Sequence, residues 1–139
     1  LLLFGAGISI ATAFTNSGLS NIIGSHMEAL STLPVLLMLL LICAAVTFLT
    51  EVTSNAATTT LLMPILAAAA LGAGIDPILF MIPAAMSASC AFMLPVATPP
   101  NVIVFATERL SIQSMVREGF ALNCLGVVII SLCCFLLLS

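Results

Sequence analysis

The stretch that decides the fold is Leu94-Pro95-Val96-Ala97-Thr98-Pro99-Pro100-Asn101, in the middle of an uncharged run between Asp76 and Glu108. A continuous helix through that run would be about 45 Å long, against about 30 Å for the hydrocarbon layer of a bilayer. Its last two prolines have no backbone N–H, so two carbonyls upstream lose their helical partners. We therefore predict two half-helices with a break at residues 95–101, a feature typical of transporters and channels.

The composition is that of an integral membrane protein. Of the 139 residues, 63% are hydrophobic, and the charged ones are only two basic and five acidic residues. Soluble domains carry about 25% charged residues, so this set is too small to cover a water-facing surface. With two basic residues, the chain also lacks the positive patch that binding to nucleic acid requires, and nucleic acid is excluded as a partner. The five cysteines lie in apolar runs and are predicted to pack as small hydrophobic side chains.

Polar and glycine-rich stretches divide the chain into four parts. Residues 1–32 are predicted to form the end of a membrane helix and an interfacial arm helix, and residues 33–74 a hairpin with its tip at 50–56. Residues 75–107 form the broken transmembrane helix, and residues 108–139 a cytoplasmic loop and a final transmembrane helix, since both arginines lie in that loop. The sequence begins with leucine inside an apolar helix, so we expect a fragment of a longer protein.

The hairpin admits two interpretations. Its arms are near the lower limit for crossing a bilayer, so they fit either two full spans or a re-entrant hairpin. The tip, Thr50-Glu51-Val52-Thr53-Ser54-Asn55-Ala56, has no Gly, Pro, Lys or Arg and gathers hydroxyls and an amide around one carboxylate. Polar non-helical backbone is tolerated at membrane depth where it lines a cavity. This pattern favours a re-entrant hairpin whose tip points at a buried site.

The two discontinuities together carry the polar groups of a candidate site. These groups are the side chains of Thr50, Thr53, Ser54, Asn55, Thr98 and Asn101 and the backbone carbonyls near Ala97. Uncharged oxygens suit a monovalent cation that has lost its water, and sodium is the natural candidate. The N-termini of the second hairpin arm and of the second half-helix present free N–H groups that suit an anion. One site could therefore bind a cation and an anion together.

Glu51 has three interpretations: a buried, hydrogen-bonded structural acid, a proton site, or a group that reaches the aqueous rim. A proton-coupled transporter or a sodium-independent exchanger would rely on it. The single histidine, His26, is predicted to be interfacial, and no nucleophile and base are paired in the sequence. An enzyme is therefore not expected.

The break has a recognisable sequence, Ser89-Cys90-Ala91-Phe92-Met93-Leu94-Pro95-Val96-Ala97-Thr98-Pro99-Pro100-Asn101-Val102-Ile103-Val104. It resembles the signature of the divalent anion:sodium symporters, the family of sodium-coupled dicarboxylate, citrate and sulfate transporters. The tip at 50–56 is similar to that family's second Ser-Asn-Thr motif. The resemblance covers essentially the whole chain. It implies an all-α, multi-pass fold, the second inverted repeat of an elevator-type transporter with a re-entrant hairpin and a broken helix. It also implies a homodimer in the lipid bilayer of the plasma membrane, or of the inner membrane in bacteria.

The same resemblance assigns roles to the polar residues. Thr50, Asn55 and the Ala97 region would bind sodium, while Ser54, Asn55, Thr98 and Pro99 would face a substrate carboxylate. Thr53, Asn101 and Glu51 are additional candidates.

The resemblance also implies the transported ions. The expected substrate is a C4-dicarboxylate such as succinate or malate, with sodium as the coupling ion and no other cofactor. Citrate or sulfate symport, sodium-independent exchange and proton coupling are the alternatives. Ala56 stands where bacterial dicarboxylate members often have threonine, and this difference leaves the identity of the anion open.

Overall fold

A computed structural model of the chain describes residues 5, 9, 12, 13, 16–18, 22 and 34–138. Within residues 34–138 every regular element is an α-helix, which confirms an all-α chain for this part of the sequence. The helices are α3 (Val35–Thr50), α4 (Asn55–Gly72), α5 (Pro77–Ser87), α6 (Pro99–Phe105) and α7 (Ile112–Leu138). The helix end and interfacial arm predicted for residues 1–32 lie almost entirely outside the described residues.

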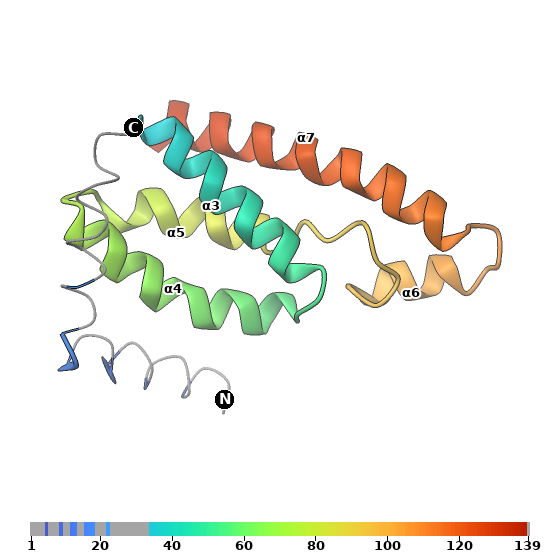
Figure 1. Cartoon of the computed structure of the whole chain (residues 1–139), viewed down its shortest axis with the longest axis horizontal. Coiled ribbons are helices and arrows are strands. Elements are labelled where there is room, and N and C mark those ends of the chain that lie inside the picture. The colour runs from blue at the N-terminus through green and yellow to red at the C-terminus, as the bar shows by residue number, and fades with distance from the viewer. Residues whose placement is uncertain are drawn as a thin grey trace.

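Helix α5 lies between the two arms of the hairpin, α3 and α4 (Figure 1). It packs against both arms and against α7, whereas the arms contact each other only slightly. α3 also packs along α7, and α6 lies beyond the ends of these helices, near the beginning of α7. The first half of the broken helix is therefore the centre of the bundle.

The turn between α4 and α5 follows directly from its sequence. Gly74 adopts a positive φ of 69°, which only glycine reaches without strain, and the N–H of Ile75 donates back to the carbonyl of Ala70 at 2.9 Å. Asp76 then caps α5 by accepting from the N–H of Ile78 at 2.9 Å, and Pro77 occupies the first helical position. The predicted division between the hairpin, residues 33–74, and the broken helix, residues 75–107, falls within this turn.

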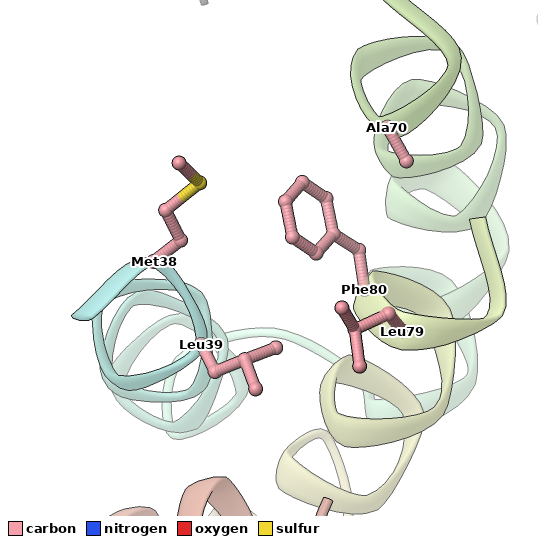
Figure 2. Close-up of a cluster of buried hydrophobic side chains, with 5 residues drawn as sticks. All are labelled: Met38, Leu39, Ala70, Leu79 and Phe80. Atoms are coloured by element: carbon pink, nitrogen blue, oxygen red, sulfur yellow. The ribbon is translucent and has the colours of Figure 1, made fainter. Parts of the chain in front are cut away.

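Apolar side chains hold α5 in its central position. Figure 2 shows Met38 and Leu39 of α3 facing Leu79 and Phe80 of α5, with Ala70 of α4 close by. Leu39 and Phe80 are fully buried. Burial of a large apolar side chain contributes about 1.5–3 kcal/mol in water. This cluster fixes the end of the bundle that is remote from the hairpin tip.

Much of the outer surface is apolar. The exposed apolar side chains of α7 include Phe120, Leu122, Leu125, Val128, Ile129, Leu132, Leu136 and Leu137. Two of the described helices, α4 and α7, are long and apolar enough to cross a membrane, while α3 and α5 are shorter. A continuous exposed apolar surface of this kind is typical of contact with lipid or with another apolar protein surface.

The break is longer than predicted and begins earlier. α5 ends at Ser87 and α6 begins at Pro99, so the chain is non-helical over residues 88–98 and the prediction of residues 95–101 was wrong at both ends. The prolines explain only the later boundary, because Pro99 and Pro100 occupy the first turn of α6. The earlier boundary has another cause, which is the capture of backbone groups by side chains from the hairpin tip.

The final helix also begins earlier than predicted. α7 begins at Ile112, and the hydroxyl of Ser111 accepts from the N–H of Ser114 at 3.1 Å as an N-terminal cap. Arg117 and Glu118 therefore lie within the helix, not in a loop that precedes a span starting at residue 119. Their exposed positions on the first turns of α7 still leave the rest of that helix uncharged.

Candidate functional site

The hairpin tip meets the break at Thr50, the last residue of α3. Its side chain is fully buried, and its hydroxyl oxygen lies 2.6 Å from Oδ1 of Asn55 and 2.9 Å from the carbonyl oxygen of Ala88. A hydroxyl has one hydrogen, so it can fully satisfy only one of these two acceptors. Three uncharged oxygens, those of Thr50, Asn55 and Ala88, thus share a single hydrogen. A cation could bind to the same oxygens.

A cavity of about 590 Å³ lies between the tip and the break. Its walls are residues 51–56 on one side and residues 96–99 on the other. The structure therefore brings seven of the predicted site residues to one cavity, whereas Thr50 and Asn101 are not among its lining residues. The seven are Glu51, Thr53, Ser54, Asn55, Ala97, Thr98 and Pro99.

The N-terminus of α4 opens into this cavity. Ser54 is its N-cap residue, yet the Ser54 side chain makes no capping hydrogen bond and is exposed. The first intrahelical bond of α4 is donated by the N–H of Thr58 to the carbonyl of Ser54 at 2.8 Å. The N–H groups before Thr58 and the hydroxyl of Ser54 are thus available to an anion, as at other helix N-termini.

The beginning of α6 is organised differently. The Thr98 hydroxyl accepts from the N–H of Asn101 at 3.4 Å, and the Asn101 side chain donates to the carbonyls of Ala91 at 2.9 Å and Leu94 at 3.0 Å. Asn101 therefore ties the break to α6 and does not line the cavity. We conclude that its amide has a local structural task.

Thr53 and the threonines of α4 differ in their partners. The Thr53 hydroxyl donates to the Leu49 carbonyl at 2.8 Å and also bonds with the hydroxyl of Thr58. Thr59 and Thr60 donate to carbonyls one turn earlier on their own helix. Thr53 lines the cavity, but its hydroxyl is already committed to the tip.

Glu51 has the densest set of hydrogen bonds in the described part of the chain. Its Oε1 accepts from the backbone N–H groups of Phe92 at 2.8 Å and Met93 at 2.9 Å, and its Oε2 from that of Leu94 at 3.0 Å. The side-chain amide of Asn123 donates to Oε1 at 2.7 Å. The residue is only 3% exposed, although it borders the cavity. This geometry fits the buried structural acid and does not fit a group that reaches the aqueous rim.

Asn123 is the residue that sequence analysis missed. It lies in α7, 72 positions from Glu51, and is fully buried. A signal was present, because an amide inside an otherwise apolar membrane helix is costly and usually has a partner or a function. Its partner could not be identified, because the contact depends on how α7 packs against the end of α3.

Among the described residues, no three His, Cys, Asp or Glu side chains gather as metal ligands. The polar groups of the cavity are instead uncharged oxygens, free N–H groups and one carboxylate that is already hydrogen-bonded. An all-α chain with an apolar exterior and its polar groups gathered where two helices are interrupted belongs to the class of α-helical membrane proteins with a buried polar site.

The chain belongs to the sodium:sulfate symporter family, whose transmembrane region matches residues 1–137. This family is the divalent anion:sodium symporter family that the sequence of the break resembles. The chain is similar to the sodium-dependent dicarboxylate transporter SdcS of Staphylococcus saprophyticus, with 45% identity over 137 residues, covering 99% of this chain and 26% of the relative. It is also similar to the protein of that name from Staphylococcus aureus strain USA300, with 43% identity over 132 residues, covering 95% of this chain and 25% of the relative. The chain thus spans about a quarter of the length of the curated relatives it matches.

Proposed function

We propose that the chain is part of a sodium-coupled symporter of divalent anions, with a C4-dicarboxylate such as succinate or malate as substrate. The observation that carries the proposal is the single cavity between tip and break, lined by uncharged oxygens and by the N-terminus of α4. The relatives are named sodium-dependent dicarboxylate transporters, which supports the same ions.

Sodium is assigned to the oxygens around Thr50. The Thr50 hydroxyl and Oδ1 of Asn55 lie 2.6 Å apart, and Asn55 and Ala97 both line the cavity. A sodium ion at this point would accept lone pairs from oxygens that now share one hydrogen, and hard cations favour such ligands. Their lack of charge favours a monovalent cation over a tightly bound divalent one.

The anion is assigned to the α4 side of the cavity. The uncapped Ser54 hydroxyl and the first N–H groups of α4 provide donors, and the helix dipole adds a favourable potential for negative charge. Thr98 and Pro99 form the opposite wall, with Thr98 half-buried and Pro99 exposed. One carboxylate of the substrate would bind here.

Asn55 couples the two ions because it contributes to both sites. Its Oδ1 faces the Thr50 hydroxyl, and its backbone N–H is the first of α4. A bound cation would also offset the repulsion between a divalent anion and the Glu51 carboxylate in a cavity of low dielectric constant. By linkage, sodium should raise the affinity for the anion, and the anion should raise that for sodium.

Sodium coupling is favoured over proton coupling through Glu51. Both carboxylate oxygens of Glu51 accept hydrogen bonds, three of them from backbone N–H groups that need an acceptor. A group that gained and lost protons in each cycle would have to give up these bonds. The uptake experiment described below distinguishes sodium coupling from proton coupling and from sodium-independent exchange.

We also propose the membrane arrangement that the resemblance implies. The hairpin is re-entrant, and its tip ends at the break inside a multi-pass protein of the plasma membrane. The full protein is a homodimer that moves the site across the bilayer by an elevator motion. The position of α5 between the hairpin arms supports the re-entrant hairpin, because such a hairpin needs a neighbouring helix to cover its polar tip.

The decisive experiment is uptake of labelled succinate by proteoliposomes containing the full-length protein, with and without an inward sodium gradient. We expect sodium-dependent uptake that Asn55→Ala abolishes. Thr60→Ala is the matched control, because the Thr60 hydroxyl donates to the Ala56 carbonyl on its own helix and lies outside the cavity. Uptake that proceeds equally well in choline would overturn sodium coupling. Uptake of citrate or sulfate but not succinate would overturn the choice of substrate.

A further inference from the structure

A hydrogen bond to Glu51 links Asn123 to the break. Asn123 is fully buried, and its amide donates to Glu51 Oε1 at 2.7 Å. Its own Oδ1 has no partner among the described residues, so the bond to Glu51 is the side-chain hydrogen bond that Asn123 makes in this part of the chain. A buried polar group of this kind is destabilising unless it is hydrogen-bonded, which gives the contact structural weight.

Gly119 lies one turn before Asn123, on the same face of α7. A Cβ atom at Gly119 would overlap the carbonyl of Phe92 and would lie 2.6 Å from the Cα of Met93. The backbone of the break therefore rests directly on α7 at this glycine. The same two residues of the break, Phe92 and Met93, also donate their N–H groups to Glu51. This short segment is thus held from two sides. Gly119 of α7 lies against it, and Glu51, which Asn123 binds in turn, accepts its N–H groups.

This segment sets the position of the cavity wall. The Leu94 N–H is bound by Glu51, and the Leu94 carbonyl accepts from the N–H of Ala97 at 3.2 Å and from the Asn101 side chain at 3.0 Å. A shift at Leu94 would thus be passed to Ala97, which lines the cavity, and to the beginning of α6. The cavity wall formed by the break begins at Val96, two positions after Leu94.

We propose that Asn123 is a positioning residue of the transport site, which holds the Glu51 carboxylate and through it the break side of the cavity. The effect on transport rests on the proposed function, whereas the effect on the break does not. An amide is required because it donates to a carboxylate. Aspartate at this position would replace the amide donor by a second carboxyl group beside the Glu51 carboxylate, and the two would repel each other or share a proton.

The test compares the full-length protein with its Asn123→Asp variant by hydrogen–deuterium exchange of the peptide containing Phe92, Met93 and Leu94. We expect exchange at these amides to be about tenfold faster, as loss of a hydrogen bond to a charged group implies. In proteoliposomes, the sodium and succinate concentrations for half-maximal uptake should both rise. A loss of folded protein alone would lower the maximal rate and leave those concentrations unchanged.

Two further variants make the test specific. Ser131→Ala is the matched control, because Ser131 is fully buried on the same helix but its hydroxyl has no partner among the described residues. Asn123→Ala removes the donor without adding charge or a carboxyl group that could share a proton with Glu51, and we expect it to give the same faster exchange. It also serves as the test if Asn123→Asp does not fold.

The proposal is overturned if exchange at residues 92–94 in Asn123→Ala equals that in Ser131→Ala. A full-length protein that takes up none of the anions tested would contradict the proposed function. The exchange measurement would still decide the role of Asn123, so the two failures are distinguishable.

Discussion

The hairpin tip and the break are both interruptions of helix, but they are stabilised in different ways. The tip, residues 51–54, is short, and Thr53 bonds to Leu49 and Thr58 of its own two arms. The break, residues 88–98, is longer, and its N–H groups at 92–94 are bound by a carboxylate from the tip. The tip therefore has hydrogen bonds between its own two arms through Thr53, whereas the break takes its shape from Glu51, more than 40 residues earlier, and, through Asn123, from α7.

If the break depends on the tip, removal of Glu51 should have the largest effect. Glu51→Ala leaves three backbone N–H groups and the Asn123 amide without an acceptor, and we expect a loss of about 4 kcal/mol in unfolding free energy. Thermal unfolding of the purified full-length protein measures this effect. Glu118→Ala removes an exposed carboxylate on α7 and should leave the midpoint unchanged. Equal midpoints for the two variants would show that the break has a stability of its own.

The second prediction tests the contact between the break and α7. Gly119→Ala forces a methyl group into the backbone of Phe92 and Met93, and we expect a loss of about 3 kcal/mol because neither backbone can move independently. Gly126→Ala is the matched control, since a Cβ there meets only the sulfur of Cys90, at 3.7 Å. Both are followed by thermal unfolding. If the two variants are equally stable, the contact with α7 does not stabilise the break.

The existence of both interruptions could be predicted from the sequence, because proline, glycine and polar residues act locally. Asp76 and Pro77 marked the beginning of α5, and the polar tip marked the end of α3. The beginning of the break could not be predicted, because nothing between Ser87 and Leu94 forbids a helix on local grounds. What ends α5 is the bonding of the amides at 92–94 to Glu51, a contact over 41 to 43 positions.

The residues of the candidate site also differ in how well the sequence predicted their roles. Ser54, Asn55 and Thr98 could be identified because each lies at an interruption, and the structure places them around one cavity. Thr53 and Asn101 belong to the same interruptions, but their hydrogen bonds serve the local chain. Such a distinction depends on side-chain direction, which residue type and spacing alone do not determine.

A third and smaller effect is expected at the junction itself. Thr50→Val keeps the shape of the side chain but leaves the Ala88 carbonyl and Asn55 Oδ1 without their shared donor, at a cost of about 1–2 kcal/mol. It also removes one proposed sodium ligand, so the sodium concentration for half-maximal uptake should rise. Thr50→Ser keeps the hydroxyl and serves as the control. An unchanged sodium dependence in Thr50→Val would remove this hydroxyl from the proposed cation site.

The smallest effect is expected on the tip side of the cavity, where Ala56 lies in the first turn of α4 and lines the wall. Ala56→Thr adds a hydroxyl beside the proposed anion site, and one additional hydrogen bond should lower the half-saturating succinate concentration about threefold. Ala57→Thr places the same side chain one position later, outside the cavity lining, and should leave this concentration unchanged. Since Glu51 is the residue that binds the amides at 92–94, neither variant should alter exchange there. A change there would mean that the first turn of α4 supports the break in addition to Glu51.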